Sequence, residues 1–279
     1  MENTEESINR QKMFEIKQIK DFGKLENPIV IEGLPGMGNV GKIALDFMID
    51  ELKAEKAYEI YSDSFPHSVF INEENLVELP KIEIFRKGNI LFLTGDVQPS
   101  NEQACYEFCT KVLDLFEQLG VKEIITTGGI GLNDIPQNPK VYCTGNDKEI
   151  IKRYTSKYSK FNDKIHNVVG PIMGVSGLLI GLSKKRNIPA ISFLSETFGH
   201  PTYLGINGAQ EILKGLDSTL KLKLNLKKME KEIKKMEKEI DSLYKPEKVE
   251  EKVEKIDKTQ PKKLIAEEKF TQHTNKYIG

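Results

Sequence analysis

Short apolar runs and helical stripes alternate along the middle of the chain, a pattern typical of β-strands alternating with α-helices. The apolar run at residues 29–31 predicts a strand, and the amphipathic segment at residues 43–52 predicts a helix. Between them, residues 33–42 contain four glycines and one proline, which predicts a loop. The chain therefore presents a strand, a glycine loop and a helix, the order in which phosphate-binding loops occur.

The next elements predict a parallel sheet. Residues 90–93 form an apolar run, residues 105–119 carry a stripe of period 3.6, and residues 123–127 form another apolar run. Ser100 and Gln103 predict a capping box at the start of the intervening helix. A strand, a helix and a strand in this order make a βαβ unit with a right-handed crossover.

A helix and a strand recur further along the chain, at residues 176–185 and 188–194. Residues 69–94 differ, because their apolar runs have a period of two and are broken by turn-forming residues, which predicts β-hairpins. Residues 1–24 are a polar lead-in, with one short strand expected at residues 14–19. The patterns predict an α/β domain at residues 25–219.

A third pattern occupies residues 220–244, where large apolar residues recur at spacings of four and three. This is the seam of a coiled-coil helix, with Lys and Glu between the seam positions. A stripe of this kind is a liability on a monomer, so it predicts oligomerisation or packing against a neighbouring subunit. The seam residues are Leu222, Leu226, Met229, Ile233, Met236, Ile240 and Leu243.

The last segment, residues 245–279, is rich in Lys, Glu and Pro and too poor in apolar residues to fold alone. It predicts a flexible charged tail. The tail ends in Tyr277, Ile278 and Gly279, so an aromatic and an aliphatic side chain lie at the end of a tether. This ending is typical of a short docking peptide.

Composition narrows the classes of partner. The 279 residues include 41 Lys and Arg against 42 Asp and Glu, which gives no argument for binding nucleic acid or an acidic membrane surface. No run of about 18 apolar residues is present, so no membrane span is expected. Three irregularly spaced cysteines are too few for a disulfide framework, which indicates a reducing, cytoplasmic environment.

The glycine loop has two interpretations. Gly36, Gly38 and Gly41 match the spacing of the dinucleotide-binding fingerprint, and residues 36–42 match a P-loop up to Ile43, which replaces the magnesium-binding hydroxyl. Asp96 and Glu196 each follow an apolar run. With the glycine loop and a second glycine-rich loop expected at residues 128–131, they are candidates to line a cleft at the strand ends. Alternatively, the glycines allow a tight turn and close packing, and the two carboxylates bind turn amides.

Complete catalytic and metal-binding sets are missing from the sequence. Residues 174–178 resemble a nucleophile elbow around Ser176, but Leu178 occupies the place of the second glycine, and Ser176 is more simply the N-cap of a helix. Cys105 and Cys109 share a helix face with apolar residues and are expected to be buried thiols. The sequence therefore predicts no catalytic residue, no metal site and no cofactor.

Several segments, taken together and in order, resemble the proteasome assembly chaperone family, specifically the second eukaryotic chaperone and its archaeal homologues. Glu196 and Thr197 fit the family's late strand-end pattern. The other matching segments are IEGLPGMGNVG at residues 31–41, FPHSV at 65–69, TGDVQP at 94–99, ITTGGIG at 125–131 and GVSGLL at 174–179.

The resemblance implies a three-layer α/β/α fold with a mostly parallel sheet, similar to nucleoside phosphorylases and related hydrolases, but without established catalysis. It implies a homo-oligomeric chaperone that binds proteasome α-subunits and their rings. Some family members end in a hydrophobic–tyrosine–any tripeptide that enters pockets between α-subunits. This chain departs from that pattern, because Tyr277 is third from the end and Ile278 is penultimate.

Two hypotheses follow from the sequence. The first is a non-catalytic, ATP-independent chaperone-like oligomer that binds proteasome α-subunits, partly through its C-terminal tail. The second is a nucleotide- or nucleoside-binding enzyme that uses the glycine loop and the strand-end cleft.

Overall fold

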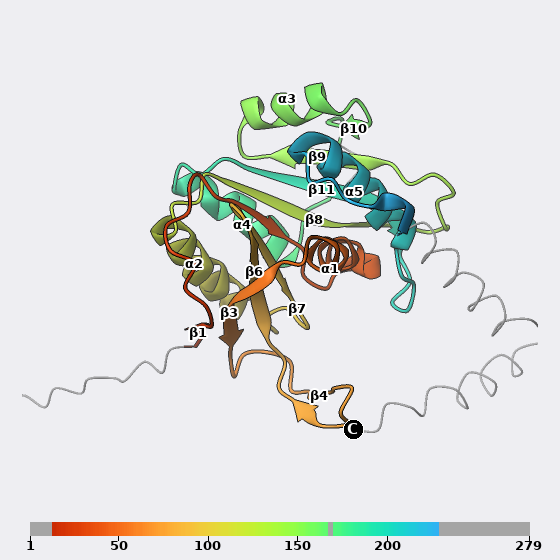
Figure 1. Ribbon diagram of the computed structural model, residues 1–279. Helices are drawn as coiled ribbons and strands as arrows, with labels where there is room; N and C mark the ends of the chain where they lie inside the picture. Colours follow the sequence, from red (N-terminus) through yellow and green to blue (C-terminus); the bar gives the residue numbers. More distant parts are fainter. Residues whose placement is uncertain (1–12, 167–169, 229–279) are drawn as a thin grey trace, which may run out of the picture. The chain divides into compact units, whose positions relative to one another are not determined.

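The computed structural model describes residues 13–166 and 170–228 of the chain. Their central feature is a mixed nine-stranded sheet (Figure 1). Across the sheet, the strands are β1 (Glu15–Gln18), β3 (Glu55–Tyr61), β6 (Ile82–Lys87), β7 (Ile90–Gly95), β2 (Ile29–Glu32), β8 (Glu123–Leu132), β11 (Ala190–Phe198), β9 (Val141–Gly145) and β10 (Phe161–Asn162).

The four central strands, β7, β2, β8 and β11, are parallel, as the βαβ pattern predicts. Ile31 of β2 lies opposite Phe92 on one side and Ile125 on the other, and all three are fully buried. Continuous apolar runs are typical of parallel strands that are covered on both faces. Antiparallel pairs join β1, β3, β6 and β7 on one side of this centre and join β9 to β11 on the other.

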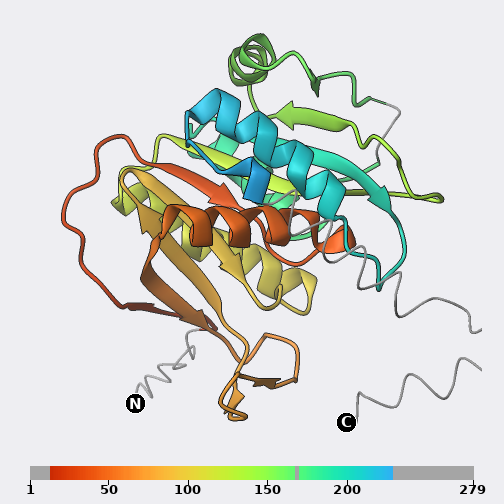
Figure 2. The ribbon, with the colours of Figure 1, turned by 45° about the vertical axis from the view of Figure 1, so that its right-hand side comes forward.

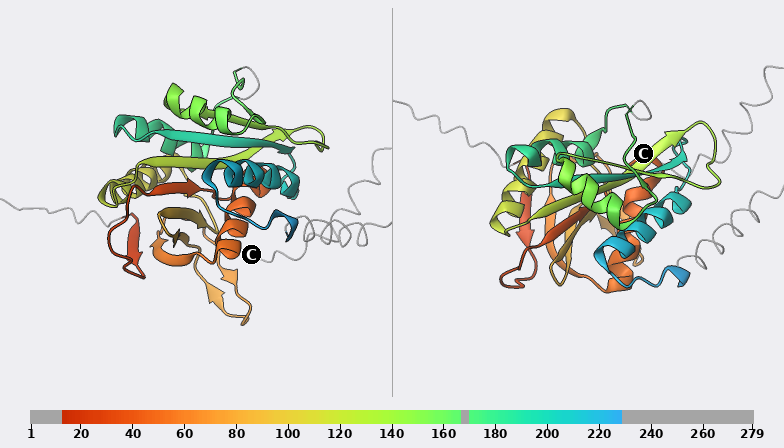
Figure 3. Two further views of the ribbon diagram at one scale, coloured as in Figure 1. Left: turned by 45° about the horizontal axis from the view of Figure 1, so that its top comes forward. Right: turned by 90° about the horizontal axis from the view of Figure 1, so that it is seen from above.

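Helices cover both faces of the sheet and make the three layers (Figure 3). One face packs against α2 (Glu102–Gln118) and α4 (Gly174–Lys185), with Phe108 and Phe116 fully buried between layers. The other face packs against α1 (Val40–Leu52), α3 (Lys148–Lys157) and α5 (Ile206–Leu220). None of the helices in the described part of the chain combines the length and the apolar character that a membrane span requires.

Three local expectations need correction. Asn101, not Ser100, caps α2, because its side chain accepts a hydrogen bond from the amide of Ala104. Ser176 lies inside the first turn of α4 and is not its cap, which is Met173. The glycines at residues 128–131 were expected in a loop, but β8 continues through them because it stays paired with β11 as far as Leu132.

The lead-in and the hairpin region contribute further strands. β1 is an edge strand that pairs with β3, and the adjacent Phe14 is buried in the core, so residues 14–18 belong to the same sheet and core. The hairpins expected at residues 69–94 are present in two parts. β6 and β7 lie in the main sheet, whereas β4 (Phe70–Ile71) and β5 (Val77–Glu78) form a separate two-stranded sheet that extends away from it (Figure 2).

Glycines permit a close approach between α1 and the sheet. A Cβ atom at Gly41 would lie 2.4 Å from the carbonyl oxygen of Thr127 in β8. Gly38, in the 3₁₀ turn Met37–Asn39 that precedes α1, has a φ of 60°, and a Cβ atom there would lie 2.6 Å from Oγ1 of Thr197. Helix α1 therefore rests on β8 with backbone against backbone, and the 3₁₀ turn before it packs against the Thr197 side chain of β11.

We predict that Gly41→Ala destabilises the protein by about 1–3 kcal/mol, because the added methyl group forces the helix away from a packed strand. Urea denaturation would measure the change. Gly181→Ala is the matched control in α4, since open space surrounds its Cβ position and alanine favours a helix by roughly 0.5–1 kcal/mol. A Gly41→Ala variant as stable as Gly181→Ala would contradict this account of the packing.

Candidate functional site

The carboxyl edge of the sheet, where β7, β2, β8 and β11 end, holds a cavity of about 370 Å³. It lies between α1, which covers one face of the sheet, and the start of α4 on the opposite face. Ligands of open α/β sheets bind at such a point, where connections leave neighbouring strands in opposite directions. Its lining includes Leu34, Gly36, Gln98, Thr127, Met173 and Ser176.

Glu32, at the end of β2, places a carboxyl group immediately behind this lining. Its Oε1 accepts hydrogen bonds from the amide of Leu34 at 3.1 Å and from the Ser176 hydroxyl at 3.2 Å. Its Oε2 is buried and has no hydrogen-bond partner among the described residues. Thr127 donates a hydrogen bond to the carbonyl oxygen of Glu32 at 2.8 Å, which fixes β2 against β8.

Burial raises the pKa of Glu32 from 4.5 to about 7, because a charged carboxylate loses its hydration inside the protein. The bonds from Leu34 and Ser176 act in the opposite direction, and they are outweighed by the burial. The Glu32 carboxyl group, at the carboxyl edge of the sheet, is therefore expected to titrate near neutral pH.

Gln98 ties three segments together at the same edge. Its Oε1 accepts a hydrogen bond from the amide of Val175 at 3.1 Å, and its Nε2 donates to the carbonyl oxygen of Pro35. The loop after β2, the loop after β7 and the first turn of α4 are thereby held in one arrangement. The Val175 amide is one of the groups at the start of α4 that lack a partner within the helix. Because it already donates its hydrogen bond to Gln98, this part of the cavity wall has its partner within the chain.

The three glycines of the fingerprint lie in different environments. Gly36 and Gly41 both line the cavity, but Gly36 is exposed, whereas Gly41 is buried against β8 and Gly38 is buried against β11. Lys42, which would bind the outer phosphates in a P-loop, pairs with Asp46 at 2.9 Å on the same helix. The geometry at Gly38 and Gly41 matches the close-packing interpretation of these two positions.

Asp96 and Glu196 do not join Gly36 around this cavity. Asp96 accepts a hydrogen bond from the amide of Lys81 at 3.3 Å and lines a separate hollow with Lys42. Glu196 accepts bonds from the amide of Lys140 at 2.9 Å and from the Tyr142 hydroxyl at 3.3 Å. Both carboxylates therefore bind backbone amides of neighbouring loops, which is the alternative that the sequence left open.

Sequence reasoning missed Glu32 and Gln98. The signal for Glu32 was an acidic residue within an apolar strand, directly before the glycine loop. Gln98 lies in the TGDVQP segment that carries the family resemblance, but its contacts could not be inferred, since Pro35 and Val175 lie far along the chain. Cys105 and Cys109 are buried as expected, and among the described residues no imidazole hydrogen-bonds to Ser176, whose hydroxyl is bound to Glu32.

The seam is described only at its start. The chain leaves α5 at Lys221, which has a left-handed φ of 59°, and the amide of Leu224 then bonds to the Asp217 carboxylate. Leu222 and Leu226 both pack against the core of their own domain. The remaining seam residues and the terminal Tyr277, Ile278 and Gly279 lie outside the described residues.

We predict that Glu32 makes stability fall as pH rises from about 4.5 to about 7. In this window the folded protein still holds the proton that the unfolded chain has released, so the free energy of unfolding decreases by about 3 kcal/mol. Urea denaturation across pH 4.5–8 would compare the wild type with Glu32→Gln, which removes the titration. Parallel pH profiles for the two proteins would contradict this prediction.

Comparison with known proteins shows where this architecture occurs. PbaB of Pyrococcus furiosus, described as an archaeal proteasome activator, matches with a TM-score of 0.74 and 31% sequence identity, over 83% of this chain and 99% of PbaB. PbaA of the same organism, described as an archaeal homolog of proteasome-assembly chaperone, matches with a TM-score of 0.70 and 23% identity, over 82% and 91% of the two chains.

The sequence comparisons agree. An uncharacterized protein of Methanocaldococcus jannaschii is 27% identical over 219 residues, which are 76% of this chain and 81% of the relative. The sequence model of the PAC2 family matches residues 30–244, from the start of β2 to the end of the predicted seam. The resemblance seen in the sequence is thus confirmed, and the chain belongs to the PAC2 family.

Proposed function

We propose that this protein is a non-catalytic, ATP-independent chaperone-like protein that binds proteasome α-subunits or their rings in the cytoplasm. The observation that carries the proposal is the match to PbaB, an archaeal proteasome activator, at 31% identity over nearly the whole of that chain. Membership of the PAC2 family supports the same class of partner.

The geometry of the carboxyl edge is consistent with a binding protein. Two of the three fingerprint glycines are packed against strands, Lys42 is paired on its own helix, and the Ser176 hydroxyl donates a hydrogen bond to Glu32. Two exposed apolar side chains, Met37 and Met173, line the cavity. Exposed methionines are typical of surfaces that accommodate other proteins.

Self-association is the second part of the proposal. The seam positions beyond Leu226 are assigned to contacts between subunits, because a helix with this stripe needs a partner. An oligomer would present several C-terminal tails to one target, and each tail that binds raises the local concentration of the next.

The tail supplies the third part. Tyr277, Ile278 and the terminal carboxylate of Gly279 are proposed to dock on the α-subunits, with the charged tether of residues 245–276 allowing them to reach their sites.

We predict that deleting residues 277–279 weakens binding to recombinant archaeal α-rings at least tenfold, because each tail loses the Tyr277 and Ile278 side chains and its terminal carboxylate moves back to Lys276. Native mass spectrometry and titration calorimetry would measure the complex and its affinity. Deletion of residues 2–12 is the control, since it removes a longer terminal segment that lacks the docking residues. Equal affinity of the tail-deleted and full-length proteins would contradict the docking of the tail.

One observation favours the second candidate function. The cavity of about 370 Å³ has the position, and nearly the size, of a small-molecule site, and the titratable Glu32 lies behind its wall. A thermal shift assay with ATP and with adenosine tests this alternative. A rise in Tm that is lost when Gly36 is replaced by Asp would favour a nucleotide- or nucleoside-binding protein, and an unchanged Tm would remove that candidate.

A further inference from the structure

The exposed large hydrophobic side chains of this domain are not scattered. Among the described residues, all of them except Ile19 and Tyr106 lie in segments at the carboxyl edge of the sheet: Met37, Val69, Phe70, Ile71, Leu76, Val77, Leu79, Ile135, Met173 and Leu204. Most of these belong to one segment, residues 68–80, which contains β4 and β5 and which we call the projecting hairpin. Since Ile82 of β6 pairs with Gly95 at the end of β7, this hairpin extends from the carboxyl edge.

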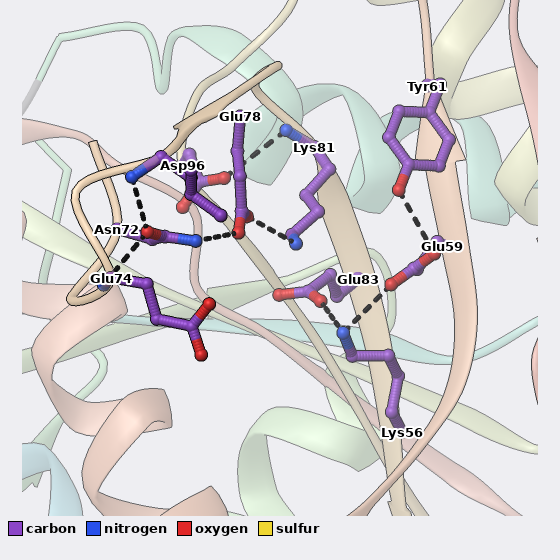
Figure 4. Close-up of polar contacts among 10 residues, drawn as sticks. Lys56, Glu59, Tyr61, Asn72, Glu74, Glu78, Lys81, Glu83 and Asp96 are labelled. Carbon is purple, nitrogen blue, oxygen red and sulfur yellow. Dashed lines mark hydrogen bonds and ion pairs between the residues drawn. The ribbon is translucent and has the colours of Figure 1, made fainter. Parts of the chain in front are cut away.

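Polar contacts give the projecting hairpin a defined shape (Figure 4). The Asn72 side chain accepts hydrogen bonds from the amides of Glu74 and Leu76, which closes the turn, and it donates to Glu78 at 2.8 Å. Glu78 also pairs with Lys81 at 3.1 Å, and the amide of Lys81 donates to Asp96. The turn is therefore closed by contacts within the hairpin, and the base is bonded to Asp96, which follows β7.

These polar contacts leave the apolar side chains of the projecting hairpin exposed, because no other described residues cover them. Ile71 lies opposite Val77 in the β4–β5 pair, and these side chains are 70% and 69% exposed. The neighbouring Leu79 is 67% exposed. An isolated two-stranded hairpin is marginally stable in water, and a contiguous exposed apolar patch marks an interaction site. The surface is thus shaped for a partner that covers it.

The charge of the projecting hairpin indicates which kind of partner can cover it. Residues 68–80 contain Glu73, Glu74 and Glu78 but no Lys or Arg, and Glu73 and Glu74 are exposed at the tip. An acidic tip is repelled by nucleic acid and by anionic membranes. It is also repelled by an identical tip on a second copy of this chain. The matching surface is an apolar groove on another protein, bordered by Lys and Arg side chains.

We propose that the projecting hairpin is a docking element that inserts Ile71, Val77 and Leu79 into an apolar, basic-rimmed groove of the partner protein. The assignment rests on the proposed function, in which that partner is the proteasome α-subunit. It adds a contact made by the folded domain, separate from the C-terminal tail.

The test is binding of the full-length chain to recombinant archaeal α-rings by titration calorimetry. Ile71→Ser/Val77→Ser is expected to weaken binding at least tenfold, because two exposed aliphatic groups no longer leave water. Ile19→Ser is the matched control, since Ile19 is 43% exposed and follows β1 at the opposite edge of the sheet.

A second variant, Glu73→Lys/Glu74→Lys, tests the charge. Both substitutions lie at the exposed tip, where they do not disturb core packing. The variant is expected to weaken binding by about the same factor as Ile71→Ser/Val77→Ser. The wild-type affinity should fall as salt rises, and this variant should lose that dependence, because attraction between exposed opposite charges is screened by ions.

The outcomes separate the two proposals. Wild-type binding that is unchanged in both hairpin variants would overturn the docking element and leave the proposed function standing. Absence of binding by the wild type would overturn the proposed function and, with it, the partner assigned to the hairpin. A hairpin variant that changes the oligomeric state in native mass spectrometry, with α-ring binding retained, would show that a second copy covers the hairpin and would overturn the proposal.

Discussion

The approach of α1 to β8 is the contact on which the carboxyl edge depends. With no side chain at Gly41, the helix backbone reaches the Thr127 carbonyl, and the loop after β2 is held down against the sheet. Thr127 in turn bonds to the carbonyl of Glu32, whose carboxyl group is closed in by the Leu34 amide and the Ser176 hydroxyl. A pattern of glycines that resembles a phosphate loop thus serves, at two of its three positions, to pack a helix on a strand.

This packing divides the carboxyl edge into two kinds of surface. Around the cavity, Gln98 bonds to the backbone of Pro35 and Val175, Glu32 bonds to the Leu34 amide and the Ser176 hydroxyl, and methionines border the open side. Beyond the end of β7, the projecting hairpin carries apolar and acidic side chains away from the sheet. Both surfaces are better suited to a protein partner than to phosphate, because the basic residue nearest the loop, Lys42, is paired with Asp46.

Much of the fold could be predicted because it follows from local periodicity. The apolar runs of β2, β7 and β8 and the stripe of α2 identified the parallel centre and its crossover. The extension of β8 to Leu132 could not be predicted, since it depends on pairing with β11, far along the chain. For the same reason Asp96 and Glu196 could not be assigned to their amides, because Lys81 and Lys140 become neighbours only in the folded sheet. The burial of Glu32 could not be predicted either, because it depends on the helices that pack over the sheet and not on the sequence of β2.

The central claim is that this PAC2 family protein acts by binding a proteasome component. Native mass spectrometry of the full-length protein mixed with recombinant archaeal α-subunits tests it most directly. The account predicts a complex of defined stoichiometry that forms without nucleotide. No complex at micromolar concentrations, together with a bound nucleoside or nucleotide that stabilises the protein alone, would contradict it.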